Sequence, residues 1–183
     1  ETNENKFDPS TVILMDFRCN QSRGLHFIYV IPFSKKKALI ESTLFSKNVE
    51  DRKFYLSAIN SYLKENFNTN FFKVLKEEKG IIPMQYMNFS LENSVSIGTR
   101  GGATKPSSGY TFIYIQKQIS NIIYQLNNNL KINNFIHTKF SLFMDKIFIK
   151  ALEKNPKFFP DLFYNCLLYK SDAADDKQCG GLG

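Results

Sequence analysis

Residues 25–45 read LHFIYVIPFSKKKALIESTLF, and this stretch decides the expected fold. Apolar segments flank a short basic segment, a pattern typical of two antiparallel strands joined by a turn. We therefore predict a β-hairpin with three lysines, residues 35–37, at its solvated tip. Because side chains alternate along a strand, one face of the second strand carries Leu39, Glu41, Thr43 and Phe45.

Glu41 is the unusual residue of this hairpin. The alternation places its carboxyl group among aliphatic and aromatic side chains, where an unpaired charge is costly. Burial favours the neutral form of a carboxyl group. The pattern therefore predicts a buried carboxylic acid in apolar surroundings.

The composition is that of one ordinary domain: 183 residues, 43% of them hydrophobic, with 18 Phe, 9 Tyr and no Trp. The formal net charge of +7 leaves nucleic acid or an anionic membrane surface open as partners. Because the lysines are dispersed, we favour compositional bias and expect no nucleic-acid partner. No apolar run reaches about 18 residues, so no transmembrane helix is expected. Cys19, Cys166 and Cys179 show neither metal spacing nor a disulfide framework, which indicates a reducing cytoplasm and no metal site.

Two segments flank the hairpin. Residues 11–18 form an expected strand that ends in Asp16 and Arg18, and both an ion pair and a functional pair are open there. Residues 51–65 show helical spacing, with Asp51 as the expected N-cap. Residues 71–75 and 81–84 are expected to be further strands.

Residues 96–112, SIGTRGGATKPSSGYTF, form a second informative stretch. A strand is expected to end at Ile97, and the glycines that follow allow close backbone approach. Pro106 is expected to open a helix whose N-terminal N–H groups favour an anion. The spacing is neither Walker A nor G-x-G-x-x-G, so on spacing alone a plain strand–loop–helix junction is the better interpretation.

The sequence pattern of the C-terminal part predicts another helix, which ends before Pro156. Its expected apolar face comprises Phe140, Phe143, Met144, Ile147, Phe148 and Ala151, and four lysines lie off this face. Core packing and a membrane interface are both open for it. Residues 166–183 turn to Asp, Ala and Gly, and CLLYKSDAADD resembles a translated sequencing adapter. We interpret them as a non-native tail.

Five blocks resemble the lycopene cyclase family in order and spacing: MDFR (15–18), FIYVIPFS (27–34), LIEST (39–43), EKGIIPM (78–84) and IGTRGGATKPSSGY (97–110). The resemblance covers residues 11–165. It implies an α+β fragment with an antiparallel substrate-domain sheet and C-terminal helices, taken from a glutathione-reductase-like or p-hydroxybenzoate-hydroxylase-like FAD fold. The family's dinucleotide-binding part lies upstream, so a C-terminal fragment that is inactive alone is expected.

The resemblance also implies a division of the chain. Residues 1–95 would belong to the substrate domain, and residues 96–127 would form a flavin-contacting strand–loop–helix. Residues 128–165 would be helical and face a membrane, and residues 166–183 would be the tail.

The site residues follow from the same resemblance. The family's acid/base glutamate matches Glu41. Its flavin-contacting segment matches Gly98, Thr99, Gly101, Gly102, Pro106, Ser107, Ser108 and Gly109. The candidate substrate-binding residues are Asp16 and Arg18, from the block that matches the family, and three aromatic candidates for the walls of a substrate site, for which core packing is also open: Phe27, Tyr29 and Phe45. Thr99 stands where related flavoproteins often have Asp, which favours backbone contacts to the flavin.

The implied activity is that of a lycopene β-cyclase. Such an enzyme closes the linear ends of lycopene to β-ionone rings through a carbocation, with reduced FAD in a non-redox role and NAD(P)H as reductant. The expected location is the cytoplasm, with peripheral membrane contact. A geranylgeranyl-reductase-like flavoprotein and a basic lipid- or nucleic-acid-binding domain are the alternatives.

Overall fold

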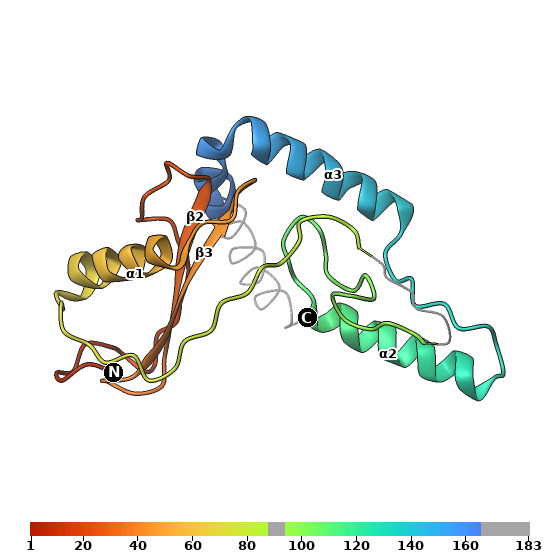
Figure 1. Ribbon diagram of the computed structural model, residues 1–183, viewed down its shortest axis with the longest axis horizontal. Helices are drawn as coiled ribbons and strands as arrows, with labels where there is room; N and C mark the ends of the chain where they lie inside the picture. The colour runs from red at the N-terminus through yellow and green to blue at the C-terminus, as the bar shows by residue number, and fades with distance from the viewer. Residues whose placement is uncertain (88–93, 166–183) are drawn as a thin grey trace, which may run out of the picture. The chain divides into compact units, whose positions relative to one another are not determined.

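The computed structural model describes residues 1–87 and 94–165. The chain forms two compact units, Glu1–Glu78 with the segment from Asn155 onward, and Lys79–Lys154 (Figure 1). One antiparallel sheet and several helices confirm the predicted α+β class, whereas the FAD-type fold stays a prediction. The functional division expected at residues 95 and 127 stays a prediction, and the expected tail at 166–183 lies outside the described residues.

The first unit contains a three-stranded antiparallel sheet in the order β1-β2-β3. Its strands are β1 (Ile13–Asp16), β2 (Leu25–Pro32) and β3 (Ala38–Phe45). β2 and β3 pair without interruption from Leu25↔Phe45 to Pro32↔Ala38. The lysines of residues 35–37 are exposed in the turn between them, which confirms the predicted hairpin.

A β-bulge interrupts the pairing of β1 with β2. Ile13 lies opposite Val30 and Asp16 lies opposite Ile28, so three steps along β1 match two steps along β2. Met15 has a φ of 50° in this bulge, in a region of backbone space that is uncommon for residues other than glycine. The extra residue shifts the alternation, so Asp16 comes to share the sheet face of Ile28 and Val30.

Helix α1 (Arg52–Phe67) follows the sheet. Its N-cap is Asp51, whose side chain accepts a hydrogen bond of 2.9 Å from the backbone N–H of Phe54, as predicted. The helix contributes two buried side chains to a core cluster with the sheet and the N-terminal segment: Phe7, Ile28, Val30, Tyr62 and Leu63. Helix α1 therefore covers the Ile28 face of the sheet.

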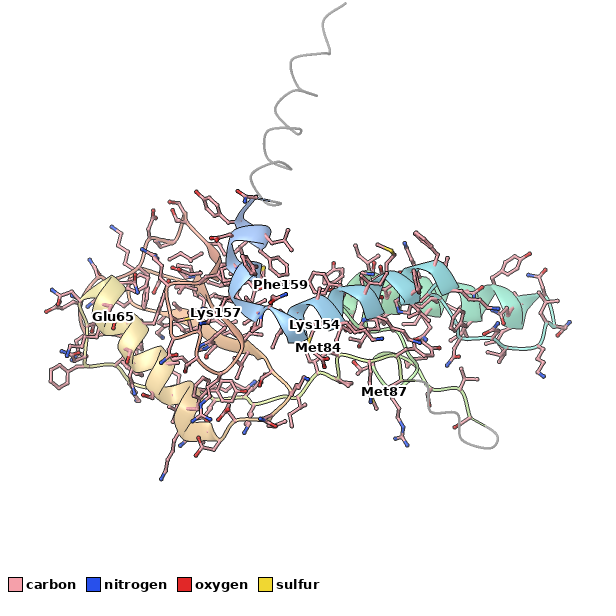
Figure 2. All side chains as sticks on the ribbon, turned by 90° about the horizontal axis from the view of Figure 1, so that it is seen from above. Glu65, Met84, Met87, Lys154, Lys157 and Phe159 are labelled. Atoms are coloured by element: carbon pink, nitrogen blue, oxygen red, sulfur yellow. The ribbon has the colours of Figure 1, made fainter. Side chains whose placement is uncertain are left out.

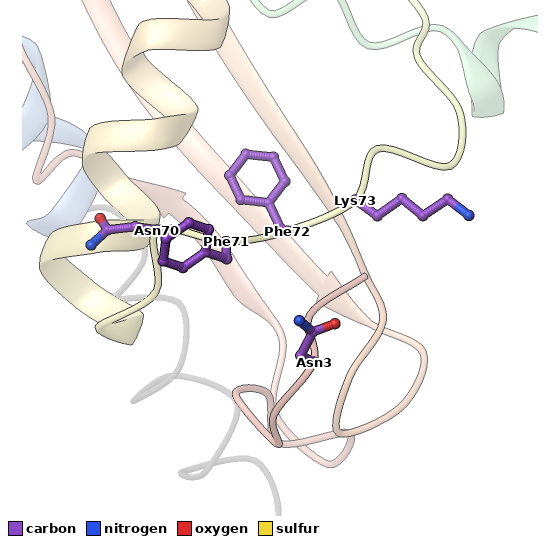
Figure 3. Close-up of a pocket in the computed structure, with 5 residues that line it drawn as sticks. All are labelled: Asn3, Asn70, Phe71, Phe72 and Lys73. Carbon is purple, nitrogen blue, oxygen red and sulfur yellow. The ribbon is translucent and has the colours of Figure 1, made fainter.

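Three strand predictions are wrong for the residues that the structure describes. It shows no strand at residues 71–75 or 81–84, and none that ends at Ile97. Phe72 makes an isolated bridge with Thr2. Its neighbours Asn70, Phe71 and Lys73 line a shallow hollow of about 310 Å³ with Asn3 (Figure 3). Ile81 and Ile82 are 67% and 58% exposed, and within residues 1–87 and 94–165 no strand pairs with this segment.

The second unit contains α2 (Phe112–Asn127) and α3 (Lys139–Lys154), and the 3-10 helix η1 (Pro156–Phe158) follows α3 in the chain. The start expected for α2 at Pro106 is wrong. The backbone of Lys105 instead bonds to Tyr110 and receives the N–H groups of Ser108 and Gly109, which closes a turn ahead of the helix. Both helices bury polar side chains, notably Gln118 of α2 and Asp145 of α3.

Both histidines of the chain are buried. His26 is held by Asn20 O at Nδ1, 3.0 Å away, and by Ser42 Oγ at Nε2, 2.8 Å away. His137 is 2% exposed, and neither of its ring nitrogens has a hydrogen-bond partner. Burial lowers the pKa of each imidazole, and in His26 the hydrogen bond that the ring makes with the carbonyl oxygen of Asn20 partly opposes this shift.

The free energy of unfolding should therefore fall as the pH is lowered from about 7 to about 5. An unfolded histidine has a pKa near 6.5, so below that pH the unfolded chain binds more protons than the folded chain. Urea unfolding followed by circular dichroism at several pH values would measure the slope. The double variant His26→Asn/His137→Asn should show a flatter profile, and a wild-type profile that is flat over this range would contradict the prediction.

Candidate functional site

Glu41 lies on the face of the sheet opposite α1. It pairs across the strands with Tyr29, and Thr43 Oγ1 donates a 2.8 Å hydrogen bond to its carboxyl oxygen. Burial, followed by the charge of Glu41, raises the pKa of Tyr29. The side chain of Glu41 is exposed, so the expected burial of this carboxyl group is wrong for the chain as described.

Aromatic side chains cover the other end of this face. Phe27 is 2% exposed and makes edge-on contacts with Phe17, Tyr29 and Phe45, with ring centroids 5.8, 5.4 and 5.4 Å away. Phe163 adds a ring 6.2 Å from Phe17. The structure thus places Tyr29 directly opposite Glu41, with Phe27 and Phe45 farther along the same face, and adds Phe17, which the sequence reasoning missed.

The exposure of Glu41 has a simple physical cause. β3 is an edge strand, and α1 covers only the face that carries Ile40 and Ala38. On the face of Glu41, the aromatic cover reaches Phe27 but not Leu39, which is 47% exposed. Glu41 therefore lies at the border between an aromatic surface and solvent.

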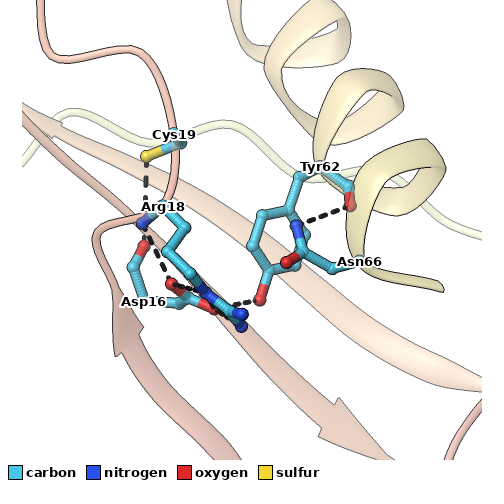
Figure 4. A network of polar contacts seen from close by, with 5 residues as sticks. All are labelled: Asp16, Arg18, Cys19, Tyr62 and Asn66. Carbon is cyan, nitrogen blue, oxygen red and sulfur yellow. Dashed lines mark hydrogen bonds and ion pairs between the residues drawn. The ribbon is translucent and has the colours of Figure 1, made fainter.

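Asp16 and Arg18 form an ion pair within a small polar network (Figure 4). Arg18 Nη2 lies 2.6 Å from Asp16 Oδ2, and Arg18 Nε lies 3.0 Å from Oδ1. Tyr62 of α1 donates a 2.5 Å hydrogen bond from its hydroxyl to Asp16 Oδ2. The network fastens the end of β1 to α1 and supports the ion-pair interpretation.

The network also shifts the pKa values of its members. Burial would raise the pKa of Asp16, but the hydrogen bonds from Arg18 and Tyr62 outweigh it and lower that pKa. Burial and the bond to Asp16 raise the pKa of Tyr62, and burial raises the pKa of Cys19 to about 11. These groups are therefore an ionised carboxylate, a neutral phenol and a neutral thiol near pH 7.

The network does not belong to the group around Glu41. Since the bulge at Met15 places Asp16 on the Ile28 face, the carboxyl groups of Asp16 and Glu41 point to opposite sides of the sheet. Arg18 and Tyr62 instead line an open hollow of about 720 Å³ beside α1, with His26, Ser57 and Ser61 among the other lining residues. A common substrate site for Asp16, Arg18 and Glu41 is not what the structure shows.

The glycine-rich loop lies in the second unit. Its backbone is folded upon itself: Gly101 N–H donates to Ile97 O, Gly102 N–H to Thr99 O, and Gly109 N–H to Lys105 O. Gln118 of α2 accepts from Gly98 N–H at 2.8 Å and donates to Gly101 O at 2.7 Å. A side chain at Gly101 would place its Cβ 2.2 Å from Ser96 O, so the packing of the loop itself requires this glycine.

This geometry fits a flavin only in part. The amide groups of the four predicted glycines, Gly98, Gly101, Gly102 and Gly109, are already bonded within the chain. Pro106 and Ser107 are buried. Thr99, Arg100 and Ser108 are exposed, so polar side chains, including one cation, are what the loop offers to the edge of an anionic ring. The predicted backbone cradle does not fit.

A buried ion pair fixes this loop to α3. Lys105 Nζ lies 2.7 Å from Asp145 Oδ1 and 3.3 Å from Ser141 Oγ. The Asp145 side chain is only 3% exposed, and its Oδ2 has no hydrogen-bond partner. Sequence reasoning missed this pair, although the position of Asp145 three residues after Leu142 and seven before Leu152 marks it as an inward-facing residue.

Comparison with known proteins identifies the family. A family profile described as lycopene cyclase protein matches residues 1–166. The chain belongs to the lycopene cyclase family. The lycopene beta-cyclase of Paracoccus sp. (strain N81106 / MBIC 01143) is 28% identical to it over 119 residues, which make up 61% of this chain and 30% of that protein. No solved structure matches the chain.

These findings confirm the resemblance seen in the sequence. As a lycopene cyclase family member, the chain spans about 30% of the length of the curated relative that it matches. The predicted site residues lie in two units: Glu41 and its aromatic neighbours in one, and the glycine-rich loop in the other.

Proposed function

We propose that this chain is the C-terminal part of a longer lycopene β-cyclase, in which Glu41 starts ring closure. The observation that carries the proposal is that Glu41 lies directly opposite Tyr29, on the sheet face that also carries Phe27 and Phe45, in a segment that matches the family. A carboxyl group next to aromatic faces suits a reaction that begins with a proton transfer and passes through a cation.

In the proposed reaction, Glu41 transfers its proton to the terminal double bond of lycopene, which leaves a tertiary carbocation. The neighbouring double bond attacks this cation and closes the ring. Loss of a ring proton then forms the double bond of the β-ionone ring, so the reaction has no net redox change. Glu41 is an anion once the cation exists. At about 4 Å and an effective dielectric near 20, their attraction is about 4 kcal/mol.

The aromatic side chains have two roles in this proposal. The ring face of Tyr29, which lies opposite Glu41, would stabilise a nearby cation by about 0.5–2 kcal/mol, and Phe45 would contact the substrate farther along the same face. Phe27, which is buried, holds those two rings in place through its edge contacts. Water has to be excluded as well, since it would add to the cation. Segments outside this chain would have to cover Glu41, because the described residues leave it exposed.

FAD, reduced by NAD(P)H, is the proposed cofactor. When bound, reduced FAD supplies negative charge that favours a cationic intermediate. In this chain, Thr99, Arg100 and Ser108 are the exposed loop residues that would contact its polar edge. We propose that Arg100 attracts the anionic form, in place of the glycine amides expected from the sequence.

The proposed location is the cytoplasmic side of a membrane, because the substrate is a hydrocarbon that dissolves in lipid. Among the described helices, none has the length and apolar character needed to span a bilayer. We therefore propose peripheral contact. We also propose that the 183-residue chain alone is inactive, because its Glu41 is open to water.

Expression of the complete protein in bacteria that accumulate lycopene tests this function. The expected result is a carotenoid with β-ionone rings, identified by chromatography and mass spectrometry. The 183-residue chain, expressed in the same cells, should leave lycopene unchanged. Unchanged lycopene with the complete protein, or reduction of geranylgeranyl groups instead, would refute the proposal.

A further inference from the structure

Helix α3 buries a charge and exposes its apolar side chains. Asp145 and Leu152 are buried, and Leu142 and Ile149 are half-buried, so this side of the helix faces the second unit. The opposite side carries four large apolar residues whose exposed fractions are 72, 57, 46 and 47%: Phe140, Phe143, Met144 and Ile147. Their spacing of three and four residues makes them one continuous stripe.

Lysines accompany this stripe along one flank. Lys139, Lys146, Lys150 and Lys154 are all exposed and fall next to the apolar side chains on the helix surface. Figure 2 shows side chains projecting along the length of α3 as far as Lys154. A helix that exposes an apolar stripe beside a row of lysines has the pattern of a helix that lies in a membrane interface. Its apolar groups enter the acyl layer and its lysines reach the headgroups.

We propose that α3 binds an anionic lipid bilayer. The side chains that would contact the bilayer, called the α3 surface, are those of Phe140, Phe143, Met144, Ile147 and the four lysines. The proposal deepens the proposed function, because lycopene would have to enter the enzyme from a lipid phase. Charge decides the occupant: the exposed lysines of α3 form a one-sided basic flank that complements acidic headgroups. A second copy of the chain would instead bring two basic flanks together.

The buried Asp145 supports this orientation of α3. Its ion pair with Lys105 fixes which side of the helix faces inward. The stripe is thereby held outward, and the helix cannot turn it into the unit without burying lysines or exposing the ion pair. The surface is therefore part of the fold and not a consequence of a mobile helix.

Vesicle flotation of the 183-residue chain tests the proposal. We expect binding to vesicles of phosphatidylcholine with phosphatidylglycerol, and much weaker binding to phosphatidylcholine alone. Phe140→Ser/Phe143→Ser/Ile147→Ser should reduce partitioning at least about tenfold. Lys146→Glu/Lys150→Glu should reduce binding to the anionic vesicles roughly fivefold or more for each lysine changed. All changed residues are exposed, and circular dichroism would confirm that the variants are folded.

A charge-matched control distinguishes an effect of the α3 surface from an effect of the net charge of the whole chain. Lys35→Glu/Lys36→Glu changes the total charge equally, but at the hairpin tip of the other unit, and should leave binding within about twofold because these lysines are not part of the α3 surface. The proposal is overturned by a wild-type chain that stays unbound, by a triple variant that binds as well as wild type, or by dimerisation or DNA binding through these residues in place of lipid binding. Flotation does not depend on the catalytic role of Glu41, so Glu41→Gln should leave it unchanged. A failure of the catalytic proposal would be seen in the turnover of lycopene and not in flotation.

Discussion

Replacement of Glu41 by Gln in the complete protein is expected to reduce cyclisation of lycopene by at least about 10²–10⁴-fold, the usual contribution of a general acid. Gln has nearly the same shape as Glu but cannot give a proton to an alkene. Thr43 can still donate its hydrogen bond to the amide oxygen, so the local structure should persist. The measurement is the rate of β-ring formation from lycopene in vesicles.

Two comparisons make this result specific. Glu65→Gln makes the same chemical change at an exposed position on α1, which packs on the other side of the sheet, and it should leave the rate unchanged. Glu41→Asp keeps an acid but shortens it by one carbon, so it should retain part of the activity. Turnover of Glu41→Gln at the wild-type rate would remove Glu41 from the mechanism.

Replacement of Lys105 by Met should destabilise the second unit by roughly 3–5 kcal/mol, the usual cost of leaving one partner of a buried ion pair without the other. The buried carboxylate of Asp145 would lose its only described charged partner among residues 1–87 and 94–165. The low end of this range is expected, because the Lys105 side chain is itself 28% exposed. Hydrogen exchange in peptides from α3 and the glycine-rich loop would measure the loss.

The double variant Lys105→Met/Asp145→Leu should recover most of this stability, since it removes both charges and adds an apolar side chain. Lys146→Met is the matched control. It removes an exposed lysine from α3, the helix that carries Asp145, and should change the free energy of unfolding by less than about 0.5 kcal/mol. Equal protection of the Lys105 variant and the wild type would show that the pair does not fix the loop.

Local patterns predicted the first unit well. The alternation of side chains predicted the bounds of both hairpin strands almost to the residue, and Asp51 predicted the start of α1. Both signals depend only on neighbours in the chain. The strands expected at 71–75 and 81–84 have β-forming residues but lack pairing partners. Strand formation needs such a partner, and the composition of a segment cannot supply it.

The bulge at Met15 shows why the site was only partly predictable. A positive φ at methionine runs against the preference of the residue, so no sequence pattern indicated it. That single residue moves Asp16 to the α1 face and removes the Asp16–Arg18 pair from the surroundings of Glu41. The group around Glu41 was predictable because uninterrupted pairing of β2 with β3 preserves the alternation.

The second unit depends on contacts between distant residues. Lys105 and Asp145 are 40 positions apart, and Gln118 reaches the loop from 20 positions away. The prediction of a flavin-binding loop assumed that the N–H groups of its glycines are free to bind the flavin, whereas these groups form hydrogen bonds within the chain. Polar side chains that face inward from α2 and α3 were the available signal, because they interrupt an otherwise apolar helical pattern.

The central claim is that lycopene binds on the sheet face that carries Glu41. Carboxyl-specific chemical labelling of the complete protein, read by mass spectrometry with and without lycopene in the vesicles, tests it most directly. We predict that lycopene protects Glu41 from labelling, while Glu4, whose side chain is 77% exposed, is labelled equally in both samples. Equal labelling of Glu41 with and without lycopene would contradict the account.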